Sequence, residues 1–162
     1  MLAISHSPQK IGGFQMFRGS SIVALDDKFR LAVPKKFREK LFEQNSSLIL
    51  TAHPDKCLVL YNLLSWAPIE KKLMSLSSFD PKISTLQRLL VGYADEVDPD
   101  KAGRILLSAS LREFAGIQQE IIMLGQGSHF EIWDKSTWSK KINSTVKNLN
   151  LENFHELEGF SL

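Results

Sequence analysis

The chain has a single cysteine and no long apolar run. Cys57 is the only cysteine among 162 residues, so no internal disulfide can form. This excludes a disulfide-stapled secreted scaffold and suits a reducing cytoplasm. The longest apolar runs, such as Cys57–Tyr61 and Ile121–Leu124, are short, whereas a membrane-spanning helix needs about 20 apolar residues. The sequence therefore indicates a cytoplasmic globular protein with no membrane partner.

Groups that catalyse reactions or bind metals are also scarce. The four histidines are scattered, and one cysteine cannot build a zinc cluster. Gly125-Gln126-Gly127 lacks the flanking pattern of a phosphate-binding loop and reads as a hairpin turn. Four acidic residues between Asp95 and Asp100 could attract a divalent cation, but a solvated turn is the favoured interpretation. We expect no enzyme, no metal and no cofactor.

Charge of one sign is not in excess, but it is unevenly distributed. The net charge is +2, from 20 basic and 18 acidic residues. Phe17–Lys40 holds seven basic and three acidic residues, whereas Asp95–Glu113 holds three and five. If a polyanion binds, the first segment should carry most of the electrostatic attraction.

What the chain does have is an internal repeat. Segments of the first half match segments of the second half in the same order, at an offset of 74 that later becomes 72: Asp26–Leu31 with Asp100–Ile105, Phe37–Glu39 with Leu111–Glu113, and Leu58–Tyr61 with Phe130–Trp133. We expect the change of offset to lie in the loop near Gln44–Ser47. The match predicts two copies of one structural unit.

The sequence of each unit predicts the same order of elements: a strand, a polar turn, a short strand, a short helix and a strand hairpin, followed by a helix. Pro34 is expected at the first helical position of the first unit, and Ser108 or Ser110 at the N-cap of the second. A unit of this size buries too little surface to fold alone. The two units should therefore share one barrel-like core, in a mainly β fold with helices of the α+β class.

The segments between and around the units are expected to differ from them. The unit boundaries are 17–66 and 92–138, with a helical connector over 67–91 and a C-terminal helix with an acidic tail over 139–162. The apolar spacing in the connector predicts two amphipathic helices, separated by a break near Ser77–Pro81, with Asp80 as the N-cap of the second. Residues 1–15 read as a disordered extension, and Met16 offers a second translation start.

Two Asp-x-x-x-Arg turns are the sharpest features of the sequence: Asp26 with Arg30, and Asp100 with Arg104. In one interpretation the aspartate accepts backbone N–H bonds and pairs with the arginine, and the turn is purely structural. In the other, the aspartate aims the guanidinium outward, where its fork can match phosphate oxygens or guanine O6 and N7.

Basic residues lie beside the turns and would add phosphate contacts in the second interpretation. Candidate DNA contacts around the two arginines are Lys28, Lys35, Lys36, Arg38 and, in the second turn, Lys101. The alternative is that these side chains belong to solvated surfaces. The two interpretations are about evenly balanced for these residues.

Several of these motifs together resemble the MraZ family. The resemblance rests on Met16-Phe17-Arg18-Gly19, the stretch from Asp26 to Pro34, Gln87–Gly92, the stretch from Asp100 to Ile105, and Gly125–Asp134. It runs from Met16 nearly to Leu162. Phe29 stands where the family usually has glycine, and Ser108 stands where the first copy has Pro34.

The resemblance implies an AbrB/SpoVT-like swapped-hairpin β-barrel in tandem, pseudo-symmetric form. It also implies a bacterial DNA-binding transcriptional regulator of the division and cell-wall gene cluster, with repression favoured. Association with the nucleoid, repeated promoter boxes in double-stranded DNA, and a homo-oligomeric ring follow from the same resemblance. The family's DNA-contact motifs fall on Asp26/Arg30 and Asp100/Arg104. The alternative function is a protein-interaction module in which the arginines are structural.

Overall fold

The computed structural model describes residues 16–43, 47–150 and 154–159, and the expected disordered extension lies outside them. Eight strands form in this part of the chain: β1 Ser20–Ala24, β2 Arg30–Ala32, β3 Leu48–His53, β4 Cys57–Asn62, β5 Asp95–Val97, β6 Arg104–Leu106, β7 Glu120–Gly125 and β8 Phe130–Asp134. The α-helices are α1 Lys35–Leu41, α2 Leu63–Ser75, α3 Pro81–Gln87, α4 Ala109–Ala115 and α5 Lys135–Lys147. The α+β class is confirmed.

The strands pair in a pattern that is the same when read from either end. Six strands form one antiparallel sheet in the order β1-β7-β8-β4-β3-β5, and β2 pairs with β6 in a separate ribbon. Exchanging each strand for its counterpart in the other repeat returns the same order. A pseudo-twofold axis therefore passes between β4 and β8 and between β2 and β6. The first strand of each repeat pairs with the hairpin of the other, which is the swapped arrangement expected.

The strand register corrects one detail of the repeat alignment. Ile49 pairs with Tyr61, so a constant offset of 72 would pair Ile121 with Trp133. Ile121 instead pairs with Asp134. One residue of the length difference therefore falls in the hairpin turns, and not in the loop near Gln44–Ser47, where residues 44–46 lie outside the described part.

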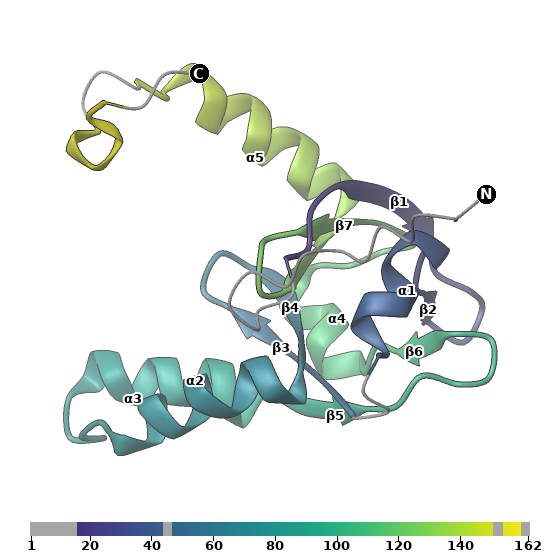
Figure 1. The fold of residues 1–162 in the computed structure, drawn as a ribbon, viewed down its shortest axis with the longest axis horizontal. Coiled ribbons are helices and arrows are strands. Elements are labelled where there is room, and N and C mark those ends of the chain that lie inside the picture. Colours follow the sequence, from purple (N-terminus) through teal and green to yellow (C-terminus); the bar gives the residue numbers. More distant parts are fainter. Residues whose placement is uncertain (1–15, 44–46, 151–153, 160–162) are drawn as a thin grey trace, which may run out of the picture.

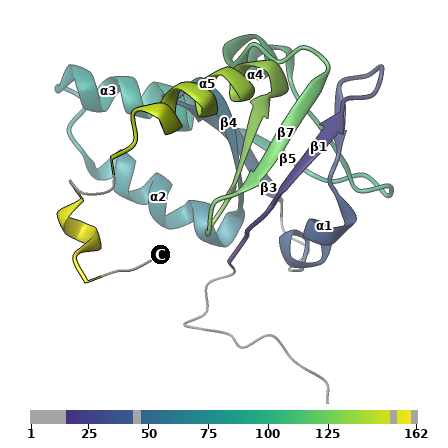
Figure 2. The same cartoon turned by 90° about the horizontal axis from the view of Figure 1, so that it is seen from above.

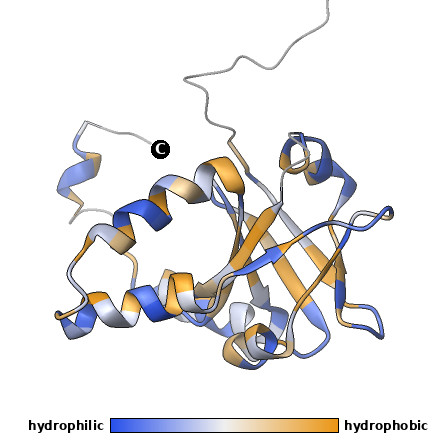
Figure 3. Ribbon diagram, turned by 90° about the horizontal axis from the view of Figure 1, so that it is seen from below, coloured by the Kyte–Doolittle hydropathy of each residue, from blue (hydrophilic) through white to orange (hydrophobic). Residues whose placement is uncertain are grey.

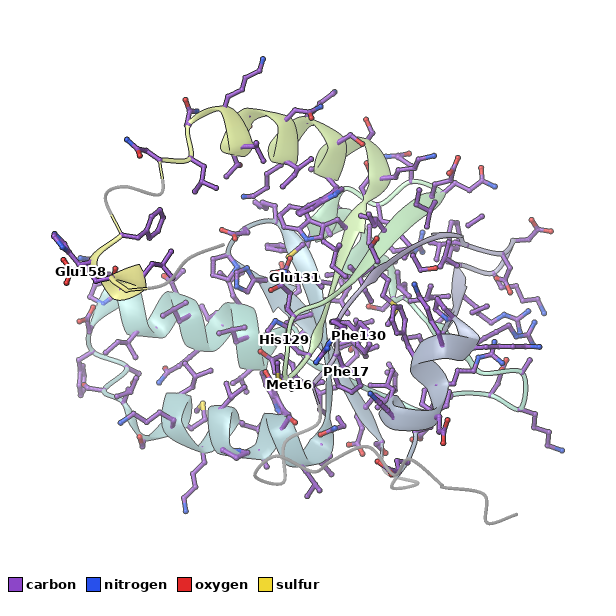
Figure 4. The ribbon with its side chains drawn as sticks, turned by 45° about the horizontal axis from the view of Figure 1, so that its top comes forward. Met16, Phe17, His129, Phe130, Glu131 and Glu158 are labelled. Atoms are coloured by element: carbon purple, nitrogen blue, oxygen red, sulfur yellow. The ribbon has the colours of Figure 1, made fainter. Side chains whose placement is uncertain are left out.

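Both repeats contribute to one apolar core. Phe130 of the second repeat packs against two aromatic rings of the first, Phe17 at 4.5 Å and Phe37 at 4.7 Å between ring centroids. Figure 4 shows Phe17 and Phe130 beside each other, and Figure 3 shows the central strands as mostly hydrophobic. Residues from the ribbon and both hairpins complete this core: Leu31, Ile105, Leu50, Leu60, Ile121 and Ile132.

The strands do not form a continuous closed barrel. The edge strands β1 and β5 are not paired with each other in the sheet of the described residues. Leu31 and Ile105, the central pair of the β2–β6 ribbon, are fully buried in the core that the sheet surrounds. The inner face of the ribbon therefore packs on the same core as the sheet.

Two helical segments project away from the barrel. The α2–α3 arm lies at the end of the molecule opposite β2 and β6, and α5 leaves the barrel on another side (Figure 1). The predicted break between α2 and α3 is confirmed, with Asp80 accepting a hydrogen bond from the Lys82 backbone N–H. A π-helical turn, Arg88–Gly92, follows α3. Thr51 is fully buried, and its hydroxyl donates to the Leu90 carbonyl at 2.8 Å and shares the same hydrogen with the Leu89 carbonyl at 3.2 Å.

The helix starts differ slightly from the expectation. Pro34 is the N-cap of α1, one position before the first helical residue. Ser108 is the N-cap of α4, as one of the two alternatives had it, but its hydroxyl lies 3.3 Å from that of Ser110 and makes no capping bond. No helix in the described ranges is long and apolar enough to span a bilayer.

We predict that Phe130→Ala lowers the free energy of unfolding by about 3–5 kcal/mol, because it opens a cavity between the two repeats. Urea unfolding should remain a single transition, since neither repeat has a core of its own. Phe79→Ala, at a ring that is 97% exposed, is the control and should change stability by less than about 0.5 kcal/mol. Two separated transitions in the Phe130 variant would contradict the shared core.

Candidate nucleic-acid interface

The first Asp-x-x-x-Arg motif forms a tight, fully bonded turn between β1 and β2. One Asp26 carboxylate oxygen, Oδ1, accepts from the backbone N–H groups of Lys28 and Arg30, each at 2.9 Å. The other, Oδ2, accepts from Arg30 Nε at 2.7 Å. The aspartate therefore shapes the turn and orients the guanidinium at the same time.

The second motif repeats this geometry between β5 and β6. Asp100 Oδ1 accepts from the backbone N–H groups of Ala102 and Arg104 at 2.9 Å, and Oδ2 accepts from Arg104 Nε at 2.7 Å. The two repeats of the motif therefore have equivalent hydrogen bonds to equivalent atoms. These hydrogen bonds are part of both interpretations of the motif, the structural one and the DNA-contacting one.

The two motifs meet across the pseudo-twofold axis. Arg30 Nη1 lies 3.9 Å from Asp100 Oδ2, and Arg104 Nη1 lies 3.8 Å from Asp26 Oδ2. The four side chains, which we call the Asp–Arg square, form one network with no net charge. The sequence did not predict this contact, because the motifs are 74 positions apart.

The ribbon register places both arginines on one outward face. Arg30 pairs with Leu106, and Arg104 pairs with Ala32, so these four residues share a face, while Leu31 and Ile105 point into the core. The arginine side chains are 29% and 34% exposed. A guanidinium has five N–H donors, and within the described chain only its Nε–H is hydrogen-bonded at each site. The Nη groups can therefore donate to a ligand.

Hydrogen bonding keeps both aspartates ionised. The backbone N–H of Arg30, and then the Arg30 side chain and the Lys28 backbone, hold the pKa of Asp26 below its ordinary value of 3.8, against a partial opposing effect of burial. The equivalent bonds from Arg104 and Ala102 lower the pKa of Asp100 in the same way. Both aspartates are therefore ionised throughout the physiological pH range.

The basic candidates separate into two groups. Lys28 and Lys101 are exposed in the two turns beside the square, and Lys35 is exposed at the start of α1. Lys36 Nζ donates to the Ser20 carbonyl at 2.7 Å, and Arg38 Nε donates to the Val33 carbonyl. The structure thus gives Lys36 and Arg38 internal partners, whereas the turn lysines extend the outward face.

Sequence reasoning missed a pair of crossed contacts, in which a helix arginine of one repeat lies against the turn of the other. Arg112 of the second repeat lies over the Phe29 ring of the first, 3.5 Å from its centroid. At the equivalent place, Arg38 of the first repeat lies so close to Gly103 of the second that an added Cβ would fall 2.7 Å from Arg38 Nε. The repeat alignment had already matched Arg38 with Arg112, and that match was the available signal.

These contacts explain how phenylalanine replaces glycine in the first turn. Phe29 has φ +59° and Gly103 has φ +73°, so both occupy the left-handed region. A side chain there costs about 1–2 kcal/mol. Stacking of a guanidinium on an aromatic ring returns about 0.5–2 kcal/mol, and Arg112 supplies it. The turn geometry is therefore retained despite the substitution.

The acidic run after the connector has a structural role in the described chain. Asp95 and Glu96 lie in β5, where they pair with Leu50 and Ile49, and Asp98 accepts from the Ser47 hydroxyl at 2.8 Å. No group of three or more histidine, cysteine, aspartate or glutamate residues that could hold a metal ion occurs in the described ranges.

Comparisons with known proteins agree with this architecture. The family model described as "MraZ protein, putative antitoxin-like" matches the chain twice, over residues 16–89 and 90–156. The transcriptional regulator MraZ of Methylobacillus flagellatus is 51% identical over 148 residues, which cover 91% of this chain and all of the relative. The regulators of the same name from Nitrosomonas europaea and Nitrosospira multiformis are 47% and 50% identical over the same shares.

The crossed strand pairing and the double match define a tandem-repeat protein of the swapped-hairpin class. The chain belongs to the MraZ family, a family whose curated relatives here are named transcriptional regulators.

We predict that Asp26→Asn lowers stability at neutral pH and that this loss shrinks in acid. A group with a lowered folded-state pKa stabilises the protein above its ordinary pKa, 3.8 here, and the stabilisation is lost as the pH falls through the folded-state value. Urea midpoints of the variant and the wild type should therefore converge below that pH. Asp27→Asn, at the exposed neighbour, is the matched control. A difference that does not depend on pH would argue against the hydrogen-bonded carboxylate.

We also predict that Gly103→Ala is more destabilising than Gly116→Ala. Both glycines have positive φ, +73° and +61°, so both variants should lose about 1–2 kcal/mol from backbone strain. The added methyl group meets Arg38 at position 103 but nothing within 4 Å at position 116. Thermal unfolding of the two variants separates these effects, and equal losses would mean that Arg38 moves aside without cost.

Proposed function

We propose that this protein is a sequence-specific DNA-binding transcriptional regulator that uses the exposed face of the β2–β6 ribbon. The observation that carries the proposal is the Asp–Arg square, in which two guanidinium groups share one outward face with lysines in both flanking turns. A two-stranded ribbon fits the major groove, and an arginine fork matches guanine O6 and N7 or phosphate oxygens.

In this proposal the residues divide into positioning and contacting roles. Asp26 and Asp100 orient Arg30 and Arg104, which contact base edges or phosphates. Lys28, Lys101 and Lys35 neutralise the DNA backbone. Lys36 and Arg38 link α1 to Ser20 of β1 and to Val33, which follows β2. The units 17–66 and 92–138, joined by the connector 67–91 and followed by 139–162, are the functional divisions of the chain.

One subunit should bind a single site weakly, because its net charge is only +2 and the square is neutral. We propose that a ring of subunits reads repeated promoter boxes, since linked sites raise avidity by roughly 10²–10⁴ without new contacts. Exposed apolar side chains support an assembly surface away from the ribbon: Leu64 on α2, Phe79 in the turn before α3, and Val146 on α5. Figure 2 shows α2, α3 and α5 on the side of the molecule opposite α1. Sedimentation of the full chain, alone and with DNA, measures this assembly.

The proposed target is the bacterial division and cell-wall gene cluster, which the regulator represses while associated with the nucleoid in the cytoplasm. The relatives named transcriptional regulator MraZ support the regulatory part of this proposal. We propose no enzymatic activity for the chain. A promoter-reporter assay in cells with and without the protein tests both the target and the sign of regulation.

We predict that Arg30→Ala and Arg104→Ala each weaken specific DNA binding by about 1–3 kcal/mol, or roughly 5- to 150-fold. The charge distribution alone favours a larger loss at Arg30. Because each arginine also approaches the aspartate of the other repeat, the two sites share one local field, and we expect losses of similar size. Electrophoretic mobility shifts over a range of salt concentrations measure the effect.

Lys71→Ala is the matched control, since Lys71 is exposed on α2, in the arm far from the ribbon (Figure 1). Its binding should equal that of the wild type. Equal losses for Lys71→Ala and the arginine variants would reject the ribbon as the interface. Binding that does not weaken with salt would favour the protein-interaction alternative.

A further inference from the structure

The two ends of the ribbon are related by pseudo-symmetry but differ in chemistry. At the offset of 74, Phe29 corresponds to Gly103 and Leu106 corresponds to Ala32. The Leu107 backbone N–H donates to the Phe29 carbonyl at 3.1 Å, and Leu106 pairs with Arg30, so Phe29 and Leu106 belong to the same end. We call it the apolar end. The opposite end has Gly103 and Ala32, which carry a hydrogen and a methyl group.

The apolar end is exposed although its residues are large. Phe29 is 40% exposed and Leu106 is 56% exposed. The Phe29 backbone lies in the left-handed region that glycine adopts without strain. Arg112 covers one face of the ring at 3.5 Å from its centroid, and this stacking restricts the orientation of the ring. Phe29 thus combines a strained backbone with an oriented, exposed ring next to Arg30 in the sequence, and this combination favours a role in binding.

We propose that Phe29 and Leu106 form a contact for thymine 5-methyl groups, so that the ribbon reads two unlike half-sites. This inference rests on the proposed function. The thymine methyl is the apolar group that base pairs present in the major groove, and apolar side chains contact it there. Arg30 supplies hydrogen-bond donors next to the apolar contact, whereas Arg104 at the other end is accompanied by small residues. One end of each DNA site is therefore read for thymine and the other is not.

The competing explanation is that Phe29 serves only to seat Arg112. That explanation predicts an effect of Phe29 on stability and none on DNA sequence preference. Leu106 separates the two explanations, because it lies on the exposed strand face outside the strained turn. Leu106→Ala should leave the turn and the Arg112 contact intact while it removes part of the apolar end.

The probe is a DNA duplex selected by the wild-type protein from a random-sequence pool, with its thymines replaced one at a time by deoxyuridine. This replacement removes only the 5-methyl group. At one or two positions on one side of the site, wild-type affinity should fall about fourfold, as expected for exposing one methyl-sized group to water. Phe29→Gly and Leu106→Ala should each bind the thymine and deoxyuridine duplexes equally at one of those positions. Lys101→Ala, at the other turn, should bind more weakly but keep the discrimination.

The possible results distinguish failure of the thymine contact from failure of the proposed DNA-binding function. If wild-type protein binds every deoxyuridine duplex as well as the parent duplex, the thymine contact is wrong while DNA binding stands. If both apolar-end variants keep the full discrimination, the contact belongs to other residues and the inference is again wrong. If the wild type selects no sequence from the pool, the proposed function fails first.

Discussion

Pairing of β2 with β6 is the constraint on which the rest of the molecule depends. Its central residues, Leu31 and Ile105, come from different repeats and are fully buried together. Neither repeat could bury its half of the ribbon alone, so the swapped sheet order and the mixed aromatic contacts around Phe130 follow from the same pairing. Two repeats in one chain thereby form a shared core that single-repeat chains could form only by associating as a dimer.

The same pairing brings two local motifs into one electrostatic unit. Each aspartate is satisfied by its own turn and also lies within 4 Å of the opposite arginine. A neutral square orients arginines well but attracts DNA weakly over distance. In the proposed function, long-range attraction therefore comes from the turn lysines and from the number of assembled subunits, while the square supplies geometry. This division of roles suits a protein whose net charge is small.

Local features of the sequence were predictable, and contacts between distant segments were not. The Asp-x-x-x-Arg spacing predicted both turns, and Asp80 before Pro81 predicted the start of α3, because each signal acts within a few residues. The square required knowledge of which strands cross the axis. The left-handed Phe29 was predictable only as a departure from glycine, since its stabilising partner, Arg112, lies 83 positions away. The helix α1 begins one residue later than expected, with Pro34 as its N-cap, because the fixed φ of proline suits the cap as well as the first turn.

The aspartates are proposed to position the arginines for DNA. Replacing Asp26 and replacing its neighbour Asp27 tests this role, because the two changes should alter DNA affinity in different directions. Asp26→Asn and Asp27→Asn each remove one negative charge near the proposed interface, so electrostatics alone predicts tighter DNA binding for both. Asp26 also holds Arg30 Nε at 2.7 Å, whereas Asp27 is exposed beside it. The dissociation constants of both variants, measured at one salt concentration on the same selected duplex, should show weaker binding for Asp26→Asn and unchanged or tighter binding for Asp27→Asn. Equal tightening in the two variants would contradict the positioning role of Asp26.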